Sequence, residues 1–171
     1  MKFRLILFLI FYTLVSTNLD ADEIEIISDH IKILENRNII KSINTTAEIK
    51  KKKLSLRGNN SIYNKKKGEI FLDGDVNFID AVENIKIITE SATYNNNTNI
   101  LSTIGDTKIE YENKYEVLSK NMIYDKNSQK IFSKNETKIK DTEGNVYTIN
   151  YKFDLDLVKE EVTTSEVSIL D

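Results

Sequence analysis

The chain has 171 residues, 40% of them apolar, which is enough for one domain with a hydrophobic core. Its formal net charge of −3 gives no basic surplus for phosphate backbones, so no nucleic-acid partner is expected. The absence of cysteine excludes disulfides, thiolate chemistry and cysteine-based zinc sites.

The first 21 residues have the layout of a secretory signal peptide. Two basic residues precede an apolar run at 5–15, and a polar stretch then ends at Ala21. The run is shorter than the roughly 20 residues that span a bilayer, although an uncleaved N-terminal anchor is the competing interpretation. We expect cleavage after Ala21, which leaves residues 22–171 as a single exported domain.

Apolar and polar residues alternate through the rest of the chain. A period of two gives a strand one apolar and one polar face, whereas no window has the spacing of an amphipathic helix. The sequence therefore predicts an all-β fold. The clearest run, predicted as a single strand, has apolar residues at alternate positions: Tyr147, Ile149, Tyr151, Phe153, Leu155 and Leu157.

A tyrosine recurs with a period of about 30 residues. Tyr63, Tyr94 and Tyr124 are 31 and 30 residues apart, and each is followed by a polar turn and an apolar strand. Such a period predicts a stack of similar β units. Ile33, 30 residues before Tyr63, marks a degraded first unit, and Phe153, 29 after Tyr124, marks a last partial one.

A second marker has the same period. Gly74, Gly105 and Asn135 follow the apolar strands at spacings of 31 and 30, each before a further strand. Glycine, or asparagine in its place, suits a corner where the backbone needs a positive φ. Stacked strands with one apolar face each form two sheets, or one folded sheet, around an apolar interior. If the two layers do not close on each other, this interior is a groove along the stack.

The repeated unit resembles the OstA-like domain of the lipopolysaccharide-transport (LptA) family over roughly residues 54–157. The segments 91–95 and 104–109 carry the pattern best, and Gly74 begins the same Gly-Asp-Val corner. The resemblance implies a β-jellyroll of stacked antiparallel strands that holds acyl chains of lipopolysaccharide and joins other jellyroll subunits, or copies of itself, through sheet edges. Both the free-standing periplasmic bridge and the N-terminal periplasmic domain of the outer-membrane assembly protein LptD fit this pattern.

The resemblance and the alternation together select candidate residues for contact with lipid. We expect the following side chains to face inward and line the groove: Ile87, Tyr94, Ile109, Tyr124, Ile139, Tyr151 and Phe153. No cofactor or metal is expected, because His30 is the only histidine and a metal site usually needs three or four ligands. The lysine runs at 50–53 and 65–67 could touch lipid phosphates or form solvated turns.

Two other functions remain as alternatives. A structural or adhesive β-solenoid would bind a protein partner through its sheet edges and have a closed, dry core. An enzyme acting on envelope polysaccharide would need a polar cleft with clustered carboxylates, and the sequence has no nucleophile or nucleotide-binding motif. A lipid bridge would have an open, apolar interior and exposed sheet edges at both ends.

Overall fold

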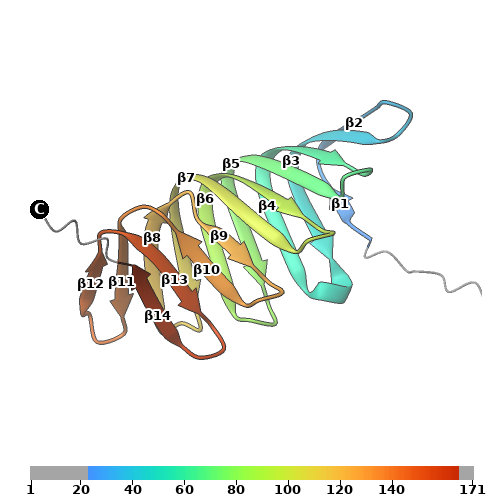
Figure 1. Cartoon of the computed structure of the whole chain (residues 1–171). Coiled ribbons are helices and arrows are strands. Elements are labelled where there is room, and N and C mark those ends of the chain that lie inside the picture. The colour runs from blue at the N-terminus through green and yellow to red at the C-terminus, as the bar shows by residue number, and fades with distance from the viewer. Residues whose placement is uncertain (1–22, 166–171) are drawn as a thin grey trace, which may run out of the picture.

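The computed structural model describes residues 23–165, so the predicted signal peptide lies outside the described residues. Nearly all of this part is one antiparallel sheet of 14 strands (Figure 1). No helix among the described residues is long and apolar enough to cross a membrane. The strands are β1 (Glu25–Ile27), β2 (His30–Leu34), β3 (Ile39–Ile49), β4 (Leu54–Asn64), β5 (Glu69–Asp80), β6 (Ile85–Asn95), β7 (Ile100–Tyr111), β8 (Tyr115–Lys120), β9 (Ile123–Asp125), β10 (Lys130–Ser133), β11 (Thr137–Asp141), β12 (Val146–Ile149), β13 (Lys152–Asp156) and β14 (Glu161–Ser165).

The sheet is folded into two halves that face each other. The long strands β3 to β7 run through both halves, and the first part of β7 pairs with β9 while its second part pairs with β8. We call half A the half whose neighbouring strands are connected by the turns beginning at residues 35, 65, 96, 126 and 157. In half B the neighbouring strands are connected by the turns beginning at residues 50, 81, 112 and 142. These spacings of 30 or 31 residues confirm the predicted repeat.

Bends in the middle of the strands create the two halves. Gly74 in β5 (φ +77°) and Gly105 in β7 (φ +84°) lie where the pairing register shifts, as the spacing of the corner residues predicts. A Cβ at Gly74 would lie 2.9 Å from the Asn59 side-chain nitrogen, so both the backbone angle and the available space favour glycine. Asn135 is different, because it has no positive φ and its strand is broken into β10 and β11.

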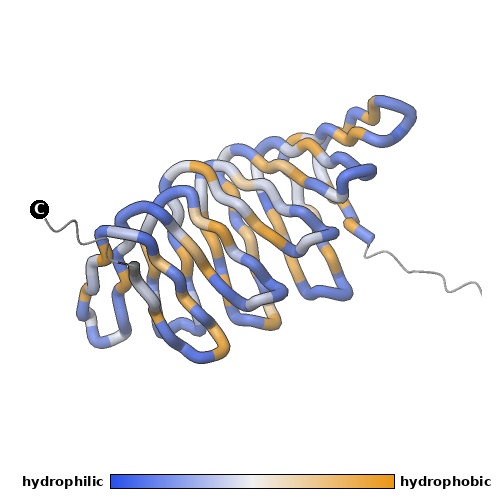
Figure 2. The backbone as a smooth tube through the Cα atoms, viewed as in Figure 1, coloured by the Kyte–Doolittle hydropathy of each residue, from blue (hydrophilic) through white to orange (hydrophobic). Residues whose placement is uncertain are grey.

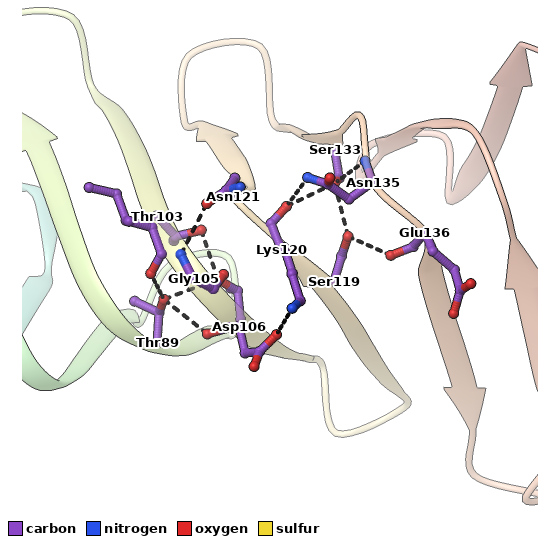
Figure 3. Close-up of polar contacts among 12 residues, drawn as sticks. Thr89, Thr103, Gly105, Asp106, Ser119, Lys120, Asn121, Ser133, Asn135 and Glu136 are labelled. Atoms are coloured by element: carbon purple, nitrogen blue, oxygen red, sulfur yellow. Dashed lines mark hydrogen bonds and ion pairs between the residues drawn. The ribbon is translucent and has the colours of Figure 1, made fainter.

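Buried hydroxyl groups connect the strands at the bends (Figure 3). The Thr107 hydroxyl donates to Thr103 Oγ1 at 2.8 Å and lies 3.0 Å from Thr89 Oγ1. One unit further along, the Thr137 hydroxyl donates to Ser119 Oγ at 3.0 Å, and Ser119 lies 2.9 Å from Ser133. These bonds satisfy buried polar groups where the strand ladder is interrupted.

Two rows of inward-facing side chains form the core, because residues directly opposite each other on paired antiparallel strands project to the same face. Figure 2 shows the corresponding alternation of hydrophobic and hydrophilic residues along the strands. The row in half A is Ile33, Ile40, Tyr63, Ile70, Tyr94, Leu101, Tyr124, Ile131, Leu155 and Val162. The row in half B is Ile26, Ala47, Leu56, Phe78, Ile87, Ile109, Val117, Ile139 and Tyr147.

These rows refine the predicted first and last units. Ile33 lies in the same row as the three marker tyrosines, so the first unit begins where the period predicts. In the last unit the equivalent residue is Leu155 rather than Phe153, because Leu155 pairs with Ile131, which pairs with Tyr124.

The single strand predicted for residues 147–157 is wrong. Its alternating residues belong to two strands, β12 in half B and β13 in half A, and the chain crosses between the halves at residues 150–151. The apolar alternation continues across the break, so a period of two alone could not reveal it.

Candidate functional site: an apolar interior open at one end

The structure places six of the seven predicted lining residues inside the molecule. The exposed fraction of each is 8% or less: Ile87 1%, Tyr94 1%, Ile109 0%, Tyr124 1%, Ile139 8% and Phe153 0%. Tyr151 is the exception, since 51% of it is exposed in the crossing between β12 and β13. The inward orientation predicted for Tyr151 is therefore wrong.

The middle of the interior is closed. The Phe78 ring from half B lies 5.9 Å, centroid to centroid, from the rings of both Tyr94 and Tyr124 in half A. Aromatic rings at this separation are in direct contact, which leaves no room for another chain between them. In this central part the two halves close on each other, so no groove runs along the whole stack.

The line along which the turns of the two halves face each other, here called the mouth, is bridged in the middle by Asp80. This carboxylate in half B is fully buried. It accepts hydrogen bonds from the Tyr124 hydroxyl at 2.8 Å and the Lys126 ammonium at 2.6 Å, both from half A. Its other oxygen accepts the backbone N–H groups of Val82 and Glu83. Burial, together with the Asp80 carboxylate, raises the pKa of Tyr124 far above its ordinary value.

Similar contacts bridge the mouth one unit before and one unit after Asp80. Toward the N-terminus, the Lys52 ammonium donates to the Asn96 carbonyl at 2.8 Å and to Asn99 Oδ1. Toward the C-terminus, the Tyr111 hydroxyl donates to the Leu157 carbonyl at 3.2 Å. In all three contacts the two partners lie 44–47 positions apart in the chain, so an equivalent bridge recurs from one unit to the next.

The interior opens at its C-terminal end. A cavity of about 620 Å³ lies between the last strands of the two halves. Its apolar lining comes from both rows and their neighbours: Tyr111, Tyr115, Val117, Ile139, Tyr147, Ile149, Leu155 and Val162. Ile139 is the only predicted lining residue at this opening. The alternation detected in the sequence includes Tyr147, Ile149 and Leu155. It could not show that they lie at an opening, because which end of the stack is open depends on the pairing of distant strands.

Both ends of the described sheet present edge strands. β1 and β2 pair only with β3 at one end, while β12 pairs only with β11 and β14 only with β13 at the other. The inward rows continue into these edges with exposed apolar side chains, as Ile33 is 56%, Tyr147 55% and Val162 40% exposed. Unpaired strands with apolar side chains can pair with a similar edge.

Two features of the described residues bear on the alternative of a polar catalytic cleft. No group of three or more histidine, cysteine or acidic side chains within residues 23–165 is arranged to hold a metal ion. Asp73 and Asp75 flank the bend at Gly74, where Asp73 accepts a hydrogen bond from the Ser91 hydroxyl and Asp75 from the Asn59 amide.

No protein-family model and no curated protein matches the chain. Among solved structures, the chain is similar to LptH, the LptA-homologous periplasmic component of the lipopolysaccharide transport device of Pseudomonas aeruginosa. The superposition has a TM-score of 0.59 and covers 75% of this chain and 97% of LptH, with 11% sequence identity. Similarity at this level of identity establishes the fold. The chain therefore has the LptA-like (OstA-like) β-jellyroll fold.

Proposed function

We propose that this protein takes part in lipopolysaccharide transport in the periplasm, where it holds lipid acyl chains inside the jellyroll and passes them on without catalysing a reaction. The observation that carries the proposal is the 620 Å³ cavity between the two halves. Most of its lining is apolar and comes from both halves, and Lys114, Asp141, Glu143 and Glu160 also line it. The fold shared with the transport component LptH supports the same role. The proposed signal peptide at residues 1–21 would export the chain, and association with the outer membrane is a further part of the proposal.

Burial of acyl chains provides the binding energy. Each methylene group moved from water into an apolar site contributes about 0.8 kcal/mol, so ten contribute roughly 8 kcal/mol before ordering costs. The cavity can accept chain ends directly through the open end. Deeper entry would require the mouth to open, because Phe78 fills the middle between Tyr94 and Tyr124.

The exposed edges support the bridging part of the proposal. We propose that β14 or β12 of one copy meets β2 or β1 of another copy, or a similar edge of another jellyroll subunit of the transport system. Such a junction would extend the inward rows, because Val162 and Ile33 are the end members of the row in half A.

Photocrosslinking tests the lipid site. A benzophenone residue at Tyr147 lies at the opening, whereas one at Ile123 (42% exposed) lies on the outer face and is the matched control. With purified protein and lipopolysaccharide we expect an adduct at position 147, lost on competition with unlabelled lipid, and none at 123. Equal labelling at both positions, or none at 147 in a folded protein, contradicts the proposal.

The second candidate function is a structural β-solenoid that binds a protein partner through its edges. The closed middle of the interior favours it, because a solenoid adhesin needs only a dry core. Absence of lipid adducts at 147 combined with capture of a specific protein partner by β12 or β14 would support this alternative.

A further inference from the structure

Two lysine runs that are separate in the sequence converge on one turn of the mouth. Residues 50–53 form the first turn of half B, and residues 65–67 belong to a turn of half A. The half-A turn at 96–99 contacts both runs. Lys52 donates to the Asn96 carbonyl at 2.8 Å, and the Asn97 amide donates to the Lys67 carbonyl at 2.9 Å. The two runs therefore lie on either side of the same turn.

This part of the chain has a charge opposite to that of the rest. Residues 50–67 contain eight basic residues and no acidic one, a net charge of +8 in a chain of −3. Residues 69–171 contain 11 basic and 20 acidic residues, a net charge of −9. Glu25 of β1 pairs with Lys50, whereas Lys53 and the lysines at 65–67 are exposed. Like charges gathered on two neighbouring turns repel each other unless counter-charges bind there.

The lysines lie at the boundary of the apolar interior. Ile49 and Leu54, which flank the run at 50–53, are 0% and 3% exposed, and Ile70, three residues after the run at 65–67, is fully buried. The strands therefore pass from interior to charged rim within a few residues. The contact from Lys52 to Asn96 bridges the mouth here, so acyl chains would reach these apolar side chains only when that contact opens. An amphiphile held in this way would present its polar head at the rim.

We infer that Lys53, Lys65, Lys66 and Lys67 form an anion-binding rim for the phosphate groups of a lipid whose acyl chains lie inside the jellyroll. The inference rests on the proposed function and adds the head-group chemistry and the residues that recognise it. Lysine ammonium groups on flexible stems bind phosphate as point charges, with charge-assisted hydrogen bonds. Added salt weakens this recognition, because exposed charges are screened beyond about 10 Å at 0.1 M ionic strength.

A pair of lipids and a pair of variants test the inference. The probes are bis-phosphorylated lipid A and the same lipid after enzymatic removal of both phosphates, and the measurement is the Kd of each for the purified protein. The rim variant carries Lys65→Gln, Lys66→Gln and Lys67→Gln. The matched control carries Lys134→Gln, Lys138→Gln and Lys140→Gln, which removes the same charge from exposed positions near β11.

We expect the unchanged protein and the control to bind the phosphorylated lipid about tenfold or more tightly than the dephosphorylated one. The rim variant should lose most of this preference and retain its affinity for the dephosphorylated lipid. Equal binding of both lipids by the unchanged protein, or an unaltered preference in the rim variant, overturns the inference and leaves the proposed function intact. Tight binding of inorganic phosphate without lipid overturns the assignment to a lipid head group. Binding of neither lipid overturns the proposed function together with the inference.

Discussion

Ile109 is completely buried in the middle of the row in half B, between Ile87 on one side and Val117 on the other. The alternation in the sequence was sufficient to place it inside, since its strand neighbours Lys108 and Glu110 are polar. Alternation could not say whether the interior around it is filled or open, because a lipid groove and a closed core have the same apolar lining. The ring of Phe78, which pairs with Ile87 in the same row, supplies that answer.

Ile109→Asp is expected to destabilise the fold by more than about 3 kcal/mol, because a carboxylate at a fully buried site has no partner. The control is Ile104→Asp, at a position that is 54% exposed on the same strand, where we expect a change within about 0.5 kcal/mol. Urea unfolding followed by circular dichroism measures both. A folded Ile109→Asp protein would show that the interior opens to water at this position.

Tyr124 links stability to alkaline pH. Its pKa is raised in the folded protein, mainly by burial and also by Asp80, so folding favours the protonated phenol. This contribution is fully present below the unfolded pKa of about 10 and is lost as the pH rises above it. We expect Tyr124→Phe to be about 1–3 kcal/mol less stable than the wild type at neutral pH, because it removes a hydrogen bond to a charged group.

Above pH 10 the stability of Tyr124→Phe should fall less steeply with pH than that of the unchanged protein. Urea unfolding at a series of pH values measures both slopes. Tyr147→Phe is the control, because Tyr147 is 55% exposed, and it should leave stability at neutral pH nearly unchanged. Identical slopes for Tyr124→Phe and the unchanged protein would show that Tyr124 is not protected from ionisation.

At the scale of the strands, the bends could be predicted from the spacing of Gly74 and Gly105, but not from glycine alone. Non-glycine residues with positive φ also occur at the bends: Asn44 in β3, Asn121 between β8 and β9, and Asp75, which shares the bend at Gly74. Asparagine and aspartate tolerate this backbone region, and the Asn121 side chain also accepts the Gly105 N–H at 3.0 Å. These residues are too common in this sequence to mark a bend without the pairing register.

Gly74→Ala is expected to cost about 2 kcal/mol or more, because the new Cβ adds a contact 3.1 Å from Asn59 Cβ to the strain of a positive φ. Gly144→Ala is the matched control. It has a similar φ of +89° but no atom within 4 Å of the new Cβ, so it isolates the backbone strain at about 1 kcal/mol. Thermal unfolding compares the two. Equal costs would show that crowding at the bend contributes nothing.

At the scale of the whole molecule, the 30-residue repeat predicted the stacking of units, and the period-two alternation predicted the all-β fold. The sequence could not predict that the strands at 147–157 divide between two halves, because that division depends on β12 pairing with β11 and β13 pairing with β10. The position of the opening follows from the same pairing. At the open end the sequence therefore predicted only Ile139 as a lining residue. Most of the other predicted residues lie in the closed part of the interior.

The exposed ends of the inward rows predict self-association through the sheet edges. Val162→Lys, on β14, and Ile33→Lys, on β2, each place a charge at the end of the row in half A without burying it. We expect either change to reduce self-association at least tenfold while leaving the unfolding temperature unchanged. Sedimentation velocity over a range of concentrations measures the effect. Val158→Lys, at a 69% exposed turn position, is the control and should associate normally.

The contact between Tyr124 and Asp80 also makes opening of the mouth visible without a label. The chain contains eight tyrosines and no tryptophan, so its ultraviolet emission comes from tyrosine alone. A phenol that donates to a carboxylate is a quenched emitter, and Tyr124 donates to Asp80 directly across the mouth. Separation of the two halves would break this bond, and the emission of the unmodified protein would rise as the interior becomes accessible.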